Sequence, residues 1–229
     1  MTKRSYCLLI ILLSSWGYGL AQSSDLQLRA GISVTKNLKK GFDWTLQHQS
    51  SFVQNASEFK TAYYTFQLGY KINKNLNAAI ECRFATTKVY DKFRWAAALN
   101  QQWKFKNTTL AWRSKLLYEH YIQAIPEINQ FNSTFNLRER LQLSKKVNAK
   151  SNVFVNVEPV FELSNDEILL KQVRQNIGLS YELNKRNSLE ITYGIFNKYN
   201  GNNLANNYRV GLNYIYELPK SKSKKKNEK

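Results

Sequence analysis

The chain has few side chains that could carry out catalysis. It contains only two histidines, His48 and His120, and His120 forms a nominal base and nucleophile pair with Ser114, six residues earlier. On an extended strand six residues separate two side chains by about 20 Å, which is too far for proton transfer. We therefore predict that the protein has no catalytic residues and is not an enzyme, and that His120 is an interfacial residue beside aromatic side chains.

Cysteine and motif content also argue against metal and cofactor chemistry. The chain has two cysteines, and Cys7 lies in an N-terminal apolar segment that we expect to be removed, so that only Cys82 remains. A single cysteine can form neither an internal disulfide nor a paired thiolate site. The sequence contains no HExxH, GxSxG, P-loop or EF-hand pattern. We predict no cofactor and no metal.

Charged residues, in contrast, recur at every second position of alternating segments. Arg29 lies between Leu28 and Ala30, for example, and Glu158 lies between Val157 and Pro159. Because alternate residues of a β-strand lie on opposite faces, such segments have one apolar and one polar face. In a membrane barrel the polar face points into the lumen. We predict the following lumen charges: Arg29, Glu81, Arg83, Arg94, Arg113, Lys115, Glu119, Arg138, Arg140, Glu158, Arg174, Glu182 and Glu190.

The mixed signs of these charges leave two outcomes open. The arginines from Arg83 to Arg174 could form structural ion pairs with the glutamates of the same face. If they are unpaired instead, a pore that they line should prefer anions.

The alternating segments also predict the fold class. They run over roughly 9 to 11 residues, the length that a tilted strand needs to cross a bilayer. A soluble sandwich would alternate too, but its short strands would not require so many charges on the polar face. We predict an all-β, membrane-spanning, antiparallel up-and-down β-barrel in the cell outer membrane. Its connections should alternate between short turns, near 37–41, 73–75, 106–107, 145–150 and 184–187, and longer loops, near 54–58, 86–91, 123–130, 164–167 and 198–207.

The number of strands is a specific expectation. Eleven segments can be counted, but bacterial barrels have even numbers of strands. We therefore expect 10 to 12 strands, and take twelve, with an irregularity between Gln123 and Thr134. Glu139 falls on the apolar face of its segment, and a β-bulge near it would restore the alternation.

The two ends of the chain differ from the middle in composition. Residues 1–21 have Lys3 and Arg4, then a short apolar run, and end at Ala21, which is typical of a cleaved signal peptide. The barrel should then span 22–218. Residues 219–229 are rich in lysine with no apolar residue after Pro219, so we expect a disordered periplasmic tail.

The formal net charge of +18 bears on the partners. Basic charge alone is not a nucleic-acid motif, and export argues against nucleic acid as a partner. We expect contacts with outer-membrane lipid and, during biogenesis, with the barrel-assembly and periplasmic chaperone machinery. The lysine-rich tail could contact anionic cell-wall polymer or lipid headgroups.

Several segments together resemble a known family. They are the opening strand around Leu26–Gly31, the strand Phe42–Gln47, the hairpin Leu68–Leu76 and the closing strand Tyr208–Tyr214. In this order they are similar to the Bacteroidota outer-membrane barrels catalogued as domain of unknown function 2490. The resemblance covers about Asp25 to Leu218 and implies an outer-membrane barrel, without catalytic residues to carry over. The chain departs from the usual barrel ending, because thirteen residues follow Tyr216.

Three functions follow as hypotheses. The first is a structural or narrow-pore barrel with a charged lumen. The alternative is a surface binding barrel that uses the loops 123–130 and 198–207. The third, an outer-membrane enzyme, would depend on His120 near the outer rim.

Overall fold

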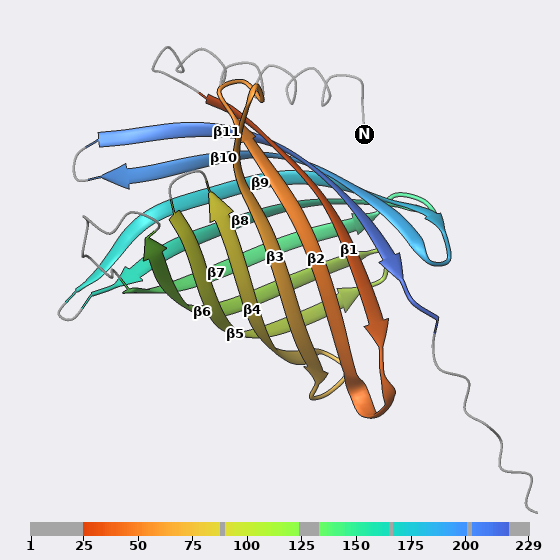
Figure 1. Ribbon diagram of the computed structural model, residues 1–229. Helices are drawn as coiled ribbons and strands as arrows, with labels where there is room; N and C mark the ends of the chain where they lie inside the picture. Colours follow the sequence, from red (N-terminus) through yellow and green to blue (C-terminus); the bar gives the residue numbers. More distant parts are fainter. Residues whose placement is uncertain (1–24, 88–89, 124–132, 165–166, 201–202, 220–229) are drawn as a thin grey trace, which may run out of the picture.

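The computed structural model describes residues 25–87, 90–123, 133–164, 167–200 and 203–219 (Figure 1). The predicted signal peptide, the tail after Pro219 and nearly all of the loop 123–130 lie outside the described residues. The strands are β1 Asp25–Asn37, β2 Phe42–Val53, β3 Glu58–Lys71, β4 Leu76–Thr87, β5 Tyr90–Phe105, β6 Thr108–Gln123, β7 Ser133–Lys146, β8 Ser151–Leu163, β9 Ile168–Asn184, β10 Asn187–Asn200 and β11 Asn203–Glu217. A short 3₁₀ turn, η1 Lys39–Gly41, joins β1 to β2.

These eleven strands, in the part of the chain that is described, close into one barrel. Strands that are consecutive in the sequence pair antiparallel. The barrel closes between β1 and β11, which pair parallel from Asp25 opposite Asn207 to Thr35 opposite Glu217. The predicted all-β barrel is confirmed, but the choice of twelve strands was wrong. A barrel whose first and last strands pair parallel can have an odd number of strands. The eleven segments counted in the sequence are the eleven strands of the barrel wall.

Side chains hold the parallel seam together at both of its ends. Near the start of β1, Arg209 donates to the Gln27 side chain at 2.8 Å, and Gln27 donates to Asn207 at 3.2 Å. Near the end of β1, the amide of Asn37 donates to Glu217 at 2.5 Å. The closing pair is therefore reinforced by polar side chains, in addition to its backbone ladder.

The connections define two ends of the barrel, which we call the turn end and the loop end. The turn end holds the connections after β1, β3, β5, β7 and β9, each of at most four residues. The loop end holds the others, of which only 124–132 is longer than four residues, so that the predicted alternation of short and long connections is found at this one connection alone. The predicted loops 86–91 and 198–207 are shorter than expected, because β4, β5, β10 and β11 extend through most of them. Long hairpin strands thus replace part of the predicted loop length.

Asparagine explains three of the tight turns. The side-chain oxygen of Asn73 accepts hydrogen bonds from the backbone N–H groups of Asn75 and Leu76, at 2.8 and 2.9 Å. Asn148 and Asn184 accept from the residues two and three positions later in the same way. Each side chain mimics a backbone turn, which is why asparagine recurs in these connections.

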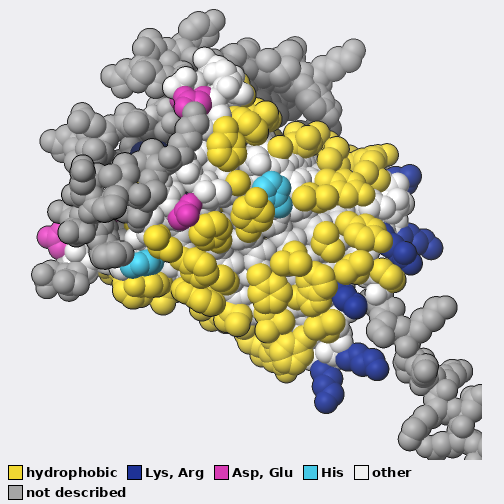
Figure 2. Space-filling view, viewed as in Figure 1, with side chains coloured by type: hydrophobic (Ala, Val, Ile, Leu, Met, Phe, Trp, Pro, Cys, Tyr) yellow, Lys and Arg dark blue, Asp and Glu magenta, His cyan; other side chains and the backbone are white. Residues whose placement is uncertain are grey.

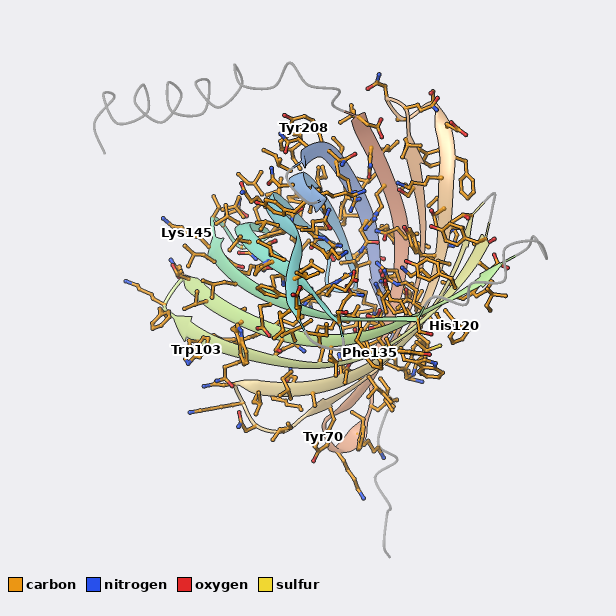
Figure 3. The ribbon with its side chains drawn as sticks, turned by 90° about the vertical axis from the view of Figure 1, so that its left-hand side faces the viewer. Tyr70, Trp103, His120, Phe135, Lys145 and Tyr208 are labelled. Atoms are coloured by element: carbon orange, nitrogen blue, oxygen red, sulfur yellow. The ribbon has the colours of Figure 1, made fainter. Side chains whose placement is uncertain are left out.

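The wall separates an apolar exterior from a polar interior. Outward side chains such as Ile80, Trp95 and Ile177 are more than half exposed, whereas inward Glu81 is 7% exposed. Apolar side chains cover most of the surface seen in Figure 2, and Tyr70 and Trp103 lie at the periphery in Figure 3. An apolar band outside and polar groups inside are typical of a membrane barrel. Within the described residues, no helix is both long enough and apolar enough to span a membrane.

The predicted bulge near Glu139 is not present. β7 pairs with β6 in unbroken register from Ser133 to Lys145. Glu139 therefore stays on the outer face, where Trp112 Nε1 and Ser114 Oγ donate hydrogen bonds to its carboxylate at 2.8 and 2.5 Å. The strand does not shift because these two donors on β6 solvate the carboxylate in place.

Candidate functional site in the barrel interior

The thirteen predicted lumen charges all lie on strands, and most are buried or half-buried on the inward face. Glu182 is the exception, because it is exposed at the turn end. The prediction missed two inward cations, Lys92 and Arg209. The alternation signal for both was present, since Lys92 is two residues before Arg94 and Arg209 lies between the outward Tyr208 and Val210.

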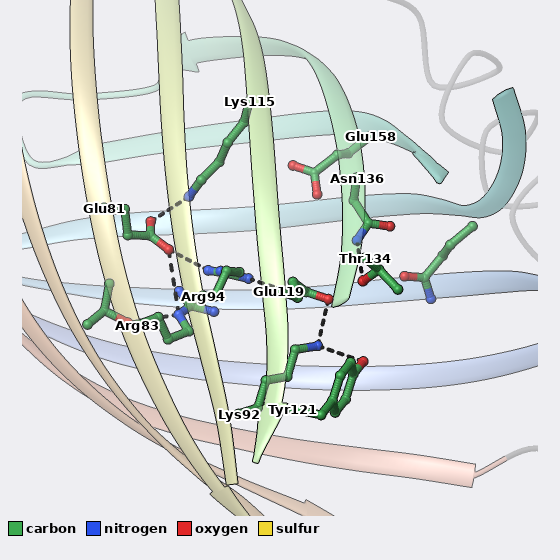
Figure 4. A network of polar contacts seen from close by, with 12 residues as sticks. Glu81, Arg83, Lys92, Arg94, Lys115, Glu119, Tyr121, Thr134, Asn136 and Glu158 are labelled. Atoms are coloured by element: carbon green, nitrogen blue, oxygen red, sulfur yellow. Dashed lines mark hydrogen bonds and ion pairs between the residues drawn. The ribbon is translucent and has the colours of Figure 1, made fainter. Parts of the chain in front are cut away.

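One cluster of charges centres on Glu81 of β4. Its carboxylate forms ion pairs with Arg94 of β5 and Lys115 of β6, and the three side chains are 7 to 9% exposed. Arg83 Nε lies 3.6 Å from the same carboxylate and donates to Thr65 Oγ1 at 2.9 Å. Glu81 therefore holds three cations from three strands (Figure 4).

A second carboxylate, Glu119 of β6, extends this network toward the loop end. Lys92 Nζ lies 2.6 Å from Glu119 and donates to the Tyr121 hydroxyl at 3.0 Å. Arg94 reaches Glu119 at 3.9 Å while it binds Glu81. Arg94 thus joins the two clusters and ties β4, β5 and β6 together on the inside of the wall.

A third cluster forms around Glu158 of β8. It pairs with Arg113, from β6, and with Arg174 of β9 at 3.1 Å. Arg174 also donates to Gln172 at 2.7 Å. Because Arg113 crosses over β7 to reach Glu158, the pair runs across the interior and does not follow adjacent strands.

Four inward arginines have no such partner. Within the described residues, no carboxylate oxygen lies within 4 Å of Arg29, Arg138, Arg140 or Arg209. Arg209 lies 4.0 Å from the centre of the Phe196 ring, and Arg29 lies 5.4 Å from that of Tyr63, which are cation–π distances. Arg29 and Arg209 are thus held by aromatic and amide groups, and none of the four has a carboxylate at ion-pair distance in the described part of the chain.

The interior carries an excess of positive charge. Between the two ends of the barrel, the inward cations are Arg29, Arg83, Lys92, Arg94, Arg113, Lys115, Arg138, Arg140, Arg174 and Arg209, and the inward carboxylates are Glu81, Glu119, Glu158 and Glu190. Ten cations and four carboxylates leave a net charge of +6. The middle of the interior is therefore positively charged.

The residues considered for catalysis do not assemble. His120 Nδ1 lies 3.2 Å from Ser133 Oγ, whereas Ser114 donates to Glu139. His48 Nε2 lies 3.3 Å from Ser50 Oγ, and its ring lies 4.8 Å from the Tyr64 ring on the outer face. Over the described part of the chain, no three metal-ligating side chains cluster.

Comparisons with known proteins place the chain among barrels. A family model described as "Protein of unknown function (DUF2490)" matches residues 30–209. A search of curated proteins found no match. The solved NanC porin resembles the chain with a TM-score of 0.52 and 12% identity, over 81% of this chain and 97% of the porin. The KdgM porin, solved in complex with disordered oligogalacturonate, gives a TM-score of 0.48 and 11% identity, over 82% of this chain and 96% of the porin. The likeness to the NanC porin shows a shared fold.

Proposed function

We propose that this chain, which belongs to the DUF2490 family, is an outer-membrane barrel that forms a narrow pore with a preference for anions. The observation that carries this proposal is the imbalance of the interior. Six cations share the three carboxylates Glu81, Glu119 and Glu158, and four further arginines have no carboxylate partner among the described residues.

Ion pairing in the interior is therefore real but incomplete. Arg83, Arg94, Arg113 and Arg174 are paired, whereas Arg138 and Arg140 are not. An unpaired cation in a narrow passage raises the local concentration of anions and disfavours cations. The paired clusters fix the shape of the wall, and the unpaired arginines supply the selectivity.

The strand number supports a narrow passage. Eight strands leave an interior that side chains just fill, whereas 16 to 18 strands leave a wide channel. Eleven strands lie nearer the first case, and inward side chains such as Leu117, Phe154 and Phe196 are buried. In such a passage a solute lies close to the inward charges.

Several features support the membrane location. Tyr70 and Trp103 lie on the outer surface near the turn end, and Tyr118 and Phe135 near the loop end, as aromatic girdles do. The one long connection, between β6 and β7, favours an outer loop end and a periplasmic turn end. Outer-membrane lipid and the machinery of barrel assembly and periplasmic transit are the corresponding partners.

The test is osmotic swelling of vesicles that contain the refolded protein. With valinomycin to carry potassium, swelling in potassium gluconate reports entry of the anion, and swelling in a neutral sugar alcohol reports the width of the passage. We expect the gluconate rate, relative to the neutral solute, to fall at least about twofold in Arg138→Gln/Arg140→Gln. The control Lys60→Gln/Lys171→Gln removes two exposed cations at the loop end and should leave the ratio unchanged.

Two results would contradict the proposal. One is an equal gluconate ratio in the arginine variant and the wild-type protein. The other is a folded barrel that admits neither solute, which would indicate a plugged lumen and favour the binding function of the loops 123–130 and 198–207.

A further inference from the structure

The turn end of the barrel is strongly basic. Its turns and strand ends carry twelve cations, which we call the basic crown: Lys36, Lys39, Lys40, Lys71, Lys74, Lys104, Lys106, Lys145, Lys146, Lys150, Lys185 and Arg186. Only Asp43, Glu182 and Glu217 oppose them, so the net charge there is +9. The described residues of the loop end have three lysines (Lys60, Lys171 and Lys198) and five acids (Asp25, Glu58, Asp91, Glu162 and Glu167), a net charge of −2.

The crown differs from the interior because its charges are not neutralised. Across the described ranges, none of the twelve cations lies within 4 Å of a carboxylate oxygen. One of the three acids nearby is engaged elsewhere, since Glu217 accepts a hydrogen bond from the Asn37 amide at 2.5 Å. All but Lys36 are exposed. Like charges so crowded repel one another unless anions lie between them.

The crown adjoins the apolar outer surface. Lys36 lies on the outward face of β1, opposite Trp44 in register, and Lys145 lies on the outward face of β7. The rings of Tyr70 and Phe42 lie 4.7 Å apart on the same outer face. Figure 2 shows lysine and arginine side chains along this edge beside the apolar surface. Aromatic side chains at the edge of an apolar band mark the boundary between hydrocarbon and headgroups. Lysines next to them extend their ammonium groups to headgroup depth.

The shortness of the turns limits how far the crown can reach. The β5–β6 connection has only residues 106–107, and the β9–β10 connection only 185–186. The lysines in and beside such turns therefore stay close to the strand ends. They can reach phosphates in the adjacent leaflet but not a polymer that lies farther from the membrane.

We propose that the basic crown binds anionic phospholipid headgroups and gathers a ring of such lipids around the turn end. The phosphate oxygens accept hydrogen bonds from the lysine ammonium groups, and the negative headgroups relieve the repulsion among the lysines. The proposal depends on the proposed membrane location, but it does not require an open pore.

The experiment measures lipid binding with the tryptophans of the refolded full chain. Trp44, Trp95, Trp103 and Trp112 all lie on the outward-facing side of their strands, so brominated lipids next to the barrel quench their fluorescence. Titration of brominated phosphatidylglycerol against brominated phosphatidylcholine gives the relative association constant of the two lipids. We expect phosphatidylglycerol to bind at least about threefold more strongly, and the preference to disappear in about 1 M salt.

Matched variants assign the effect to the crown. Lys36→Gln/Lys74→Gln/Lys145→Gln should lower the preference for phosphatidylglycerol toward equality. Lys60→Gln/Lys171→Gln/Lys198→Gln removes the same charge from the loop end and should keep it. Equal binding of both lipids by the wild-type protein, or the same loss in both variants, would overturn the proposal.

Two further results distinguish lipid binding by the crown from binding of cell-wall polymer and from the proposed pore function. Co-sedimentation with isolated cell-wall sacculi that depends on the crown, without any lipid preference, would also overturn it and would favour the polymer. A silent pore with an intact lipid preference would contradict the proposed function alone.

Discussion

Neutralising Glu81 should destabilise the barrel far more than neutralising another inward glutamate. In Glu81→Gln, the cations Arg94, Lys115 and Arg83 lose the carboxylate that they share, while the shape of the side chain is kept. Glu190 is also inward-facing but has no ion pair within the described residues. Glu190→Gln therefore makes the same chemical change without breaking a pair.

The burial of the Glu81 cluster sets the magnitude. Glu81, Arg94 and Lys115 are 7 to 9% exposed, so their charges are poorly screened by solvent. Removing one partner of a buried ion pair costs about 3–5 kcal/mol, because it leaves the other charge uncompensated. Glutamine still accepts a hydrogen bond, so we expect a loss near the lower limit, about 3 kcal/mol, in the free energy of unfolding. For Glu190→Gln we expect a change below about 1 kcal/mol.

Reversible urea unfolding in lipid vesicles, followed by tryptophan fluorescence, measures both variants. The reasoning requires a clear difference between them. It is refuted if the two variants lose the same stability, or if Glu81→Gln is as stable as the wild-type protein.

Two further predictions use the same unfolding measurement. A Cβ at Gly178 would clash with the ring of Phe154, so Gly178→Ala should cost about 1–3 kcal/mol. Gly211→Ala, where the added atom would press against only the Thr192 side chain, should cost less, and an equal loss would argue against the packing of Phe154. Glu139→Leu should cost about 1–3 kcal/mol, because it leaves the Trp112 and Ser114 donors unpaired on the outer face. A gain in stability would instead show that the lipid-facing carboxylate is itself the larger cost.

The sequence was sufficient to predict the strands and the faces of their side chains. Alternation alone placed Arg29 and Glu158 on the inward face, because the period of a strand depends only on local geometry. It could not predict that β1 and β11 pair parallel, because that pairing joins residues 182 positions apart, such as Asp25 and Asn207, and has no local signal. Eleven strands were counted correctly in the sequence. The count was rejected because other bacterial barrels have even numbers of strands.

The sequence also could not predict which lumen charges form ion pairs with one another. Arg113 and Arg140 face the same way and are opposite each other in register, yet only Arg113 reaches Glu158. Which arginine is paired depends on the tilt of the strands and on side-chain reach across the lumen. The sequence therefore did not show that the charge left unpaired in the interior is positive. That required knowing which arginines form ion pairs.

The sign of the reversal potential of the refolded chain, in a planar bilayer with a gradient of potassium chloride, tests the central claim most directly. The uncompensated arginines predict discrete conductance steps with a reversal potential of the sign set by chloride. Arg138→Gln/Arg140→Gln should move that potential toward zero. A reversal potential of the sign set by potassium would contradict the claim that these arginines line an anion-preferring pore.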